Sequence, residues 1–107
     1  MSNHPGAWSY TSCVKRDEVE RRLLEVHARL VRARQELAVA EEQLDVFVET
    51  ADEARIRSLV SETPLADRDW QDAQRHVEAM IRGRDTASAR VTELERVQDE
   101  LLGKLVV

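Results

Sequence analysis

The sequence contains few of the residues that build disulfides, turns and aromatic cores. Among its 107 residues are one cysteine, two prolines and three glycines, and only 4% are aromatic. The single cysteine, Cys13, cannot form an internal disulfide. Clusters of β-branched and aromatic residues, which favour strands, are also missing. The sequence therefore predicts an all-α fold.

Motifs for membranes, metals and catalysis are missing as well. No window contains the roughly 18 apolar residues that a membrane span needs, and no secretory signal precedes the charged region, so we expect a cytoplasmic protein. Cys13 has no nearby histidine, and the three histidines are far apart in the sequence. We therefore predict no catalytic residue, no metal site and no cofactor, and expect the protein not to be an enzyme.

Charged residues make up 35% of the chain, and the net charge is −5. Affinity for nucleic acid depends on concentrated lysine and arginine, so this balance argues against a nucleic-acid binder. The basic block from Arg21 to Arg34 is the segment that could support such binding, but we expect acidic residues to lie opposite it. Arginine outnumbers lysine fourteen to two, which is typical of GC-rich coding and indicates a bacterial protein.

Apolar residues recur in two segments at alternating steps of three and four, the spacing of a coiled-coil seam. The first set is Val19, Leu23, Val26, Leu30, Ala33, Leu37, Ala40, Leu44, Phe47, Ala51 and Ala54. The second set is Ala66, Trp70, Ala73, Val77, Met80, Arg84, Ala87, Val91, Leu94, Gln98, Leu101 and Leu105. We predict a first helix at about 17–60 and a second at about 64–103.

A turn at about 61–63 should join these helices into an antiparallel hairpin covering 17–107. Thr63 can cap the second helix, and Pro64 suits the first helical position because its missing N–H would be unpaired there anyway. Folding the chain at this point brings residue i opposite about 126 minus i. The acidic stretch from Glu36 to Glu53 then faces arginines of the second helix. Among them, Arg84 in the seam should reach Glu41 or Asp45.

The segment before the first helix, residues 1–16, is predicted to be a flexible arm because it lacks the apolar periodicity of a helix and contains serine, asparagine, proline and glycine. It carries Trp8, Tyr10 and Cys13. Aromatic residues in such an arm can anchor to a partner. The alternative is an extension without a role.

A second apolar set lies on the first helix, nearly opposite the seam, and predicts an interface. Its members are Leu24, Val31, Val39, Val46, Ile56 and Val60, accompanied by Ala28 and Ala38. We favour a homodimer formed through this face. A different protein partner is the second interpretation, and apolar residues merely tolerated on a helix surface are the third.

The turn gathers charged residues around an aromatic side chain. Arg55, Arg57, Asp67, Asp69 and Trp70 are the candidate partner-binding residues of this tip. The hairpin and its acidic "LADRDW" end resemble, in architecture, the Gre and DksA transcription factors. That resemblance implies binding to RNA polymerase through the acidic tip, although the globular domain and zinc-binding cysteines of those families have no counterpart here. The main prediction is a non-enzymatic coiled-coil interaction or scaffold module that presents its tip to a protein.

Overall fold

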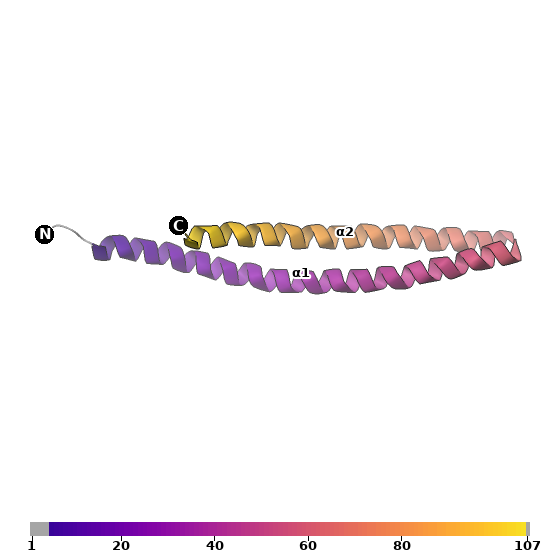
Figure 1. Ribbon diagram of the computed structural model, residues 1–107, viewed down its shortest axis with the longest axis horizontal. Coiled ribbons are helices and arrows are strands. Elements are labelled where there is room, and N and C mark those ends of the chain that lie inside the picture. Colours follow the sequence, from indigo (N-terminus) through magenta and orange to yellow (C-terminus); the bar gives the residue numbers. More distant parts are fainter. Residues whose placement is uncertain (1–4, 107) are drawn as a thin grey trace. The chain divides into compact units, whose positions relative to one another are not determined.

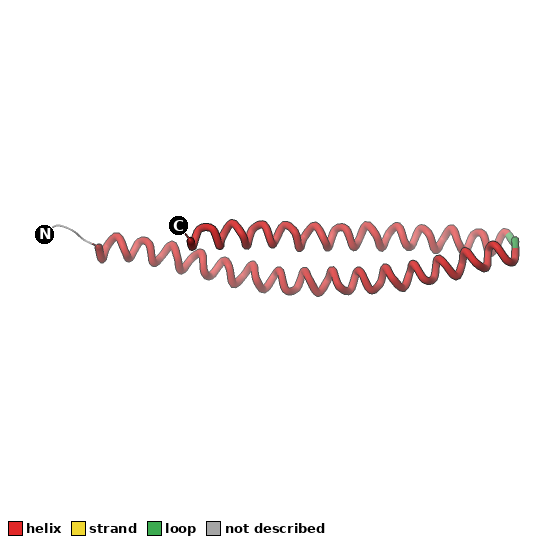
Figure 2. The backbone as a smooth tube through the Cα atoms, in the orientation of Figure 1, coloured by secondary structure: helices red, strands yellow, loops and turns green. Residues whose placement is uncertain are grey.

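The computed structural model contains two long helices and describes residues 5–106, with side chains from 14 to 105. Helix α1 (Pro5–Ser61) and helix α2 (Pro64–Val106) are joined through Glu62 and Thr63, as Figures 1 and 2 show. No strand occurs within this described range. The all-α hairpin of two long helices is thus confirmed. Neither helix, over the residues described, has a stretch long and apolar enough to cross a bilayer.

Helix α1 begins earlier than the sequence analysis predicted. It starts at Pro5 and not near Asp17, so the backbone of residues 5–16 is helical. Proline suits the first turn of a helix, and the next proline in the chain is Pro64, so no residue of this type interrupts the backbone hydrogen bonds in between. Residues 1–4 and the side chains of Trp8, Tyr10 and Cys13 lie outside the described part, and the flexibility of the arm stays a prediction.

The chain divides into two compact units, which are described separately. The hairpin unit, Ala33–Val91, contains the turn and the helical segments on either side of it. The terminal unit joins α1 up to Arg32 with α2 from Thr92 onward. In both units, every residue of the predicted seam with a described side chain is buried or half-buried.

Three pairs of side chains define the register of the hairpin unit. Arg90 Nη1 donates to Glu36 Oε2 at 3.2 Å, the rings of Phe47 and His76 stack with centroids 5.7 Å apart, and Ser58 Oγ donates to Asp67 Oδ1. The residue numbers of these pairs add to 126, 123 and 125, which confirms the predicted fold-back.

This register sets large seam residues opposite small ones. Trp70 falls opposite Ala54, and Val91 falls opposite Ala33. Both alanines are buried, whereas Trp70 is half-buried. A large side chain fits against a small one without forcing the helices apart, because side chains in such a seam interdigitate. The alternation therefore allows a tryptophan in a seam that is otherwise narrow.

Arg84 differs from its predicted pairing. Its Nε atom donates to Asp85 Oδ1 at 2.9 Å, so its carboxylate partner is the next residue in the chain and not Glu41 or Asp45. The side chain is half-buried, and the register sets it opposite Ala40, whose small size leaves room for the arginine methylenes. Arg84 thus fills a seam position while its charged group stays at the solvent edge.

The terminal unit has a small apolar core and an ion-pair cluster on α2. Val26, Leu30 and Leu101 are its buried apolar residues among those described. Arg96 bonds to both Glu93 and Glu100 of the same helix. The hydrogen bond from Arg96 and its positive charge lower the pKa of Glu93. Because these side chains are exposed and belong to one helix, the cluster supports α2 locally and adds little to the packing of the two helices.

The adjacent residues Leu101 and Leu102 test the seam. Leu101 is 2% exposed and Leu102 is 45% exposed. We expect Leu101→Ala to lower the free energy of unfolding by about 2 to 5 kcal/mol, because it removes buried methyl groups and leaves a cavity. The matched change Leu102→Ala should alter it by less than about 0.5 kcal/mol. Urea unfolding followed by circular dichroism measures both, and equal effects would contradict the seam.

Candidate functional site

The backbone of the turn is held by capping hydrogen bonds. Glu62 has φ 51°, a left-handed conformation, and its N–H donates to Ser58 O at 3.1 Å. This bond terminates α1 with a left-handed residue, a position that glycine usually occupies in other helices. On the other side, Thr63 Oγ1 accepts a hydrogen bond from Ala66 N at 3.2 Å, which confirms the predicted cap of α2. Glu62 and Thr63 thus complete the reversal of the chain direction.

A side-chain hydrogen bond joins the helices directly below the turn. Ser58 is buried, and its hydroxyl donates to the carboxylate of Asp67. The sequence analysis missed Ser58 because it followed apolar residues only, although one further step of four from Ala54 reaches it. It also interpreted Asp67 as a partner-binding residue. The structure shows a carboxylate that already accepts a bond across the hairpin.

The remaining predicted tip residues are distributed between two pockets and the exposed surface. Arg57 and Asp69 line one pocket, Trp70 lines another, and Arg55 is exposed and lines neither. The first pocket has a volume of about 380 Å³ and is also lined by Phe47, Thr50, Ala54, Asp72, Ala73 and His76. Arg57 and Asp69 thus share a pocket, whereas a common contact surface for all five residues stays a prediction.

The pocket beside Arg57 combines charged walls with an aromatic stack. The His76 ring lies against Phe47 with an angle of 21° between the planes, and Asp72 bonds to Arg75 at 2.5 Å. No group of three potential metal ligands occurs among the described residues.

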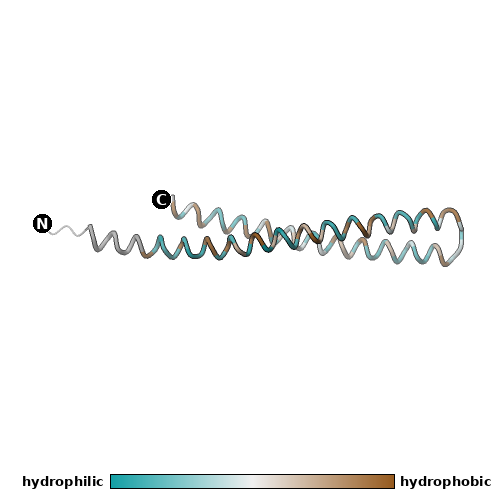
Figure 3. The backbone as a smooth tube through the Cα atoms, turned by 90° about the horizontal axis from the view of Figure 1, so that it is seen from below, coloured by the Kyte–Doolittle hydropathy of each residue, from teal (hydrophilic) through white to brown (hydrophobic). Residues whose placement is uncertain are grey.

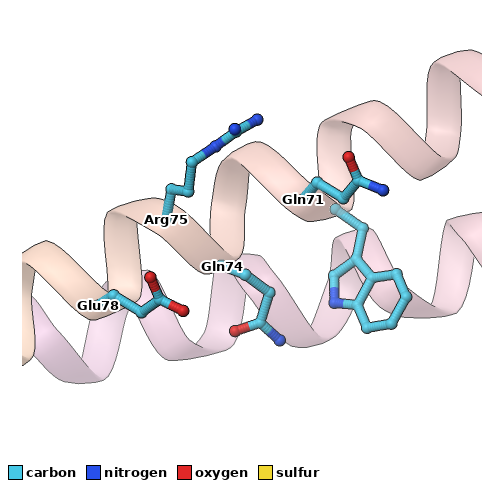
Figure 4. A pocket seen from close by; sticks show the side chains of 5 residues that line it. Gln71, Gln74, Arg75 and Glu78 are labelled. Carbon is cyan, nitrogen blue, oxygen red and sulfur yellow. The ribbon is translucent and has the colours of Figure 1, made fainter.

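The second pocket, of about 450 Å³, lies beside Trp70 on α2. Its other lining residues are Gln71, Gln74, Arg75 and Glu78. Figure 4 shows these four on one helix, with Arg75 pointing away from Gln74 and Glu78. The indole Nε1 of Trp70 is buried and has no hydrogen-bond partner. Because a single helix supplies all its walls, this pocket is a shallow surface hollow.

Four large apolar side chains surround the turn and are exposed to water. The exposed fractions are 61% for Ile56, 65% for Leu59, 80% for Val60 and 67% for Leu65. We call these four residues the apolar tip; Figure 3 shows hydrophobic colour on both helices next to the turn. Sequence analysis had interpreted Ile56 and Val60 as part of the dimer face and had not singled out Leu59 or Leu65. Their spacing around the turn was the available signal.

The other residues of the predicted dimer face are exposed too. Leu24, Val31, Val39 and Val46 all have a large part of their surface in water. This exposure agrees with the predicted unpartnered face on α1. The dimer itself stays a prediction.

Comparisons with protein-family models, with curated proteins and with solved structures find no match for this chain. The resemblance to Gre and DksA hairpins stays an interpretation that depends on the hairpin and its acidic end. A function must therefore be inferred from the exposed chemistry of the tip and of α1.

The left-handed backbone at Glu62 predicts a stabilising substitution. A side chain in this conformation is disfavoured by about 1 to 2 kcal/mol relative to glycine, and part of that gain is offset by the greater freedom of glycine in the unfolded chain. We expect Glu62→Gly to raise the free energy of unfolding by up to about 1 kcal/mol. The matched change Ser61→Gly, at the last helical residue of α1, should lower it. Thermal unfolding compares them, and a destabilised Glu62→Gly variant would contradict the assignment.

A double-mutant cycle tests the bond between Ser58 and Asp67. Asp67 also lies near the positive end of the α2 dipole, so Asp67→Ala alone mixes two effects. Combining it with Ser58→Ala isolates the pair, for which we expect a coupling of about 0.5 to 1.5 kcal/mol. Urea unfolding of the four proteins yields this number. Strict additivity would show that the bond contributes nothing to the hairpin.

Proposed function

We propose that this chain is a non-enzymatic interaction module, active in the bacterial cytoplasm, that docks a protein partner through the apolar tip. The observation that carries the proposal is the exposure of Ile56, Leu59, Val60 and Leu65 around one turn. Clustered apolar side chains at the end of a helical hairpin are a feature of interaction surfaces. In this proposal, the charged residues that the sequence predicted to bind the partner flank the apolar tip.

Burial of the apolar tip in a partner offers a substantial driving force. Moving one such side chain from water into an apolar pocket contributes on the order of 1.5 to 3 kcal/mol. Each of the four side chains is more than half exposed, so most of that gain is still available to a partner. A few apolar anchors of this kind commonly dominate the binding energy of an interface.

The turn presents these side chains on a backbone that is already ordered. The cap at Thr63 and the bond between Ser58 and Asp67 hold the two helix ends together. Binding then requires little additional ordering of the backbone, and less of the binding energy is lost as conformational entropy. Asp67 thus supports docking by fixing the turn and not by contacting the partner.

Charged residues next to the apolar tip can orient the partner. Arg55, Glu62 and Arg68 are exposed and lie close to it in the sequence. Charges at the rim of an interface contribute to specificity and to the association rate more than to affinity. We therefore expect a partner surface with an apolar recess surrounded by charges of both signs.

Photocrosslinking in the source cells tests the apolar tip. With benzoylphenylalanine at Leu59, we expect one discrete protein adduct, and none of the same size from the control position Leu102, which is also an exposed leucine. Adding Val60→Ser and Leu65→Ser should remove at least about nine-tenths of the adduct, because apolar anchors dominate such contacts. Asp69→Asn should leave it unchanged.

The same experiment separates the apolar tip from the acidic one. Loss of the adduct with Asp69→Asn, but not with the serine substitutions, would contradict the proposal and favour contact through the acidic residues. Purified RNA polymerase is the first protein to test as the adduct partner, because the resemblance to Gre and DksA implies it. Equal adducts from positions 59 and 102 would show that the tip has no specific partner.

A further inference from the structure

The pocket beside Arg57 extends across both helices of the hairpin unit. Four of its eight lining residues belong to α1 and four to α2. Its α1 wall contains Thr50 and Arg57. The register sets these two opposite His76 and Asp69 of the α2 wall, since the residue numbers of each pair add to 126. The pocket is therefore part of a groove that follows one side of the seam, and we call it the side groove.

On α1, a row of exposed side chains borders the side groove at steps of seven residues. The row consists of Val46, Glu53 and Val60. Each of them is three or four residues from Thr50 or Arg57, the spacing of neighbours on a helix surface. Thr50 Oγ1 also donates to Val46 O at 3.1 Å, one turn earlier on α1. This row is therefore the α1 rim of the side groove.

The matching row on α2 consists of Leu65, Asp72 and Ala79, which are three or four residues from Asp69 or His76 and are exposed. In the register of the hairpin unit, the two rows form opposed pairs whose residue numbers add to 125. These pairs are Val60 with Leu65, Glu53 with Asp72, and Val46 with Ala79. The side groove thus has an apolar pair at each end and an acidic pair midway between them.

We infer that the side groove binds an amphipathic helix of the protein partner, in which one basic residue lies midway between two apolar residues. Residues seven apart return to the same side of a helix and are separated by about 10.5 Å, which matches the step between the pairs. Helices commonly bind grooves through anchors of this spacing. The two apolar anchors would be fourteen residues apart, and lysine or arginine would meet the acidic pair.

This inference rests on the proposed function, because Val60 and Leu65 belong to the apolar tip and also to the rims of the side groove. A partner helix along the side groove would form one wall of the recess that receives the tip. The bound surface would then continue from the turn along about 21 Å of the hairpin unit, at about 1.5 Å per residue.

The charge of the α1 rim favours a basic helix over an acidic one. Seven acidic residues and no basic residue occur from Glu36 to Glu53. Glu49 and Glu53 are four residues apart and make no ion pair with any described residue. Like charges at this spacing destabilise a helix, and a lysine or arginine of the partner would relieve the repulsion. Asp72, on the other rim, shares its charge with Arg75 at 2.5 Å.

The side groove has room for another helix. Ala54 and Ala73 are small, and the stacked rings of Phe47 and His76 lie beside them in the lining of the pocket. Gly83 lies seven residues after His76 on the same wall, and a Cβ atom there would meet no other atom within 4 Å. Open space therefore continues beyond the pocket, away from the turn.

Photocrosslinking at Ala79 tests the side groove separately from the apolar tip. With benzoylphenylalanine at this exposed position, fourteen residues after Leu65, we expect an adduct of the same size as from Leu59. Gln74 is the control, because it is exposed, is nearer to the turn and lines the hollow beside Trp70 instead. It should yield less than about one-tenth of the adduct.

The outcomes distinguish the two proposals. An adduct from Leu59 without one from Ala79 overturns the side groove and leaves the tip contact standing. An adduct from Ala79 without one from Leu59 supports the side groove and contradicts the tip contact. Equal adducts from Ala79 and Gln74 overturn the side groove, since binding would then not be confined to one side of the seam.

A charge reversal tests the predicted basic residue of the partner. We expect Glu53→Lys to lower the yield of the Ala79 adduct by at least about tenfold, because it sets like charges in opposition. Asp52→Lys makes the same change at the adjacent exposed residue, which belongs to neither rim, and should lower the yield by less than about twofold. Equal effects would show an unspecific attraction to acidic residues and would overturn the inference.

Mass spectrometry of the Ala79 adduct locates the crosslinked segment of the partner. We expect a helical segment with lysine or arginine seven residues from an apolar residue on each side. A synthetic peptide of this segment should bind the purified chain, and replacing its central basic residue by glutamate should weaken binding by at least about tenfold. An acidic or extended segment, or a peptide indifferent to that change, would contradict the inference.

Discussion

The reversal of the chain at Glu62 and Thr63 is the constraint on which the hairpin unit depends. Once the direction changes there, the three-and-four spacing of each helix can be satisfied only by its neighbour running the opposite way. The bond between Ser58 and Asp67 fixes which seam positions meet, and the ion pair between Glu36 and Arg90 follows at the same register. A slip of one heptad would separate both pairs.

The composition of the seam explains why large apolar side chains remain exposed on this hairpin. Alanines occupy several buried positions, including Ala33, Ala51 and Ala54, so each contributes less apolar burial than a leucine would. Larger apolar side chains such as Leu24 and Val60 are instead exposed. The residues that could strengthen the hairpin core are thus placed where only another molecule can cover them. This distribution supports an interaction role for both the tip and α1.

Sequence periodicity predicted the fold well because the hairpin has one dominant contact. The seam, the cap at Thr63 and the fold-back register all follow from local rules and a single reversal. The start of α1 at Pro5 was not predicted, since the serines, asparagine and glycine before Asp17 favour disorder, whereas continuation of a helix depends on cooperative backbone hydrogen bonds. Predicting the site was harder. From the sequence alone, Asp67 is simply an acidic residue near the turn, because its bond to Ser58 depends on the register of the two helices. The exposure of Leu59 and Leu65 likewise depends on the geometry of the folded turn.

A thin seam also couples association to folding. Any molecule that binds the folded hairpin and not the unfolded chain stabilises it by mass action. Because the fully buried positions of the hairpin unit are mostly alanine, a partner that covered exposed residues such as Val39 and Val46 would add apolar burial to a modest core. The stability of the hairpin would then rise with the concentration of such a partner. The same argument does not apply to the apolar tip, whose four residues surround a turn that is already fixed by its own hydrogen bonds. The tip is therefore free to exchange partners without unfolding the hairpin, which is the property that a docking surface requires.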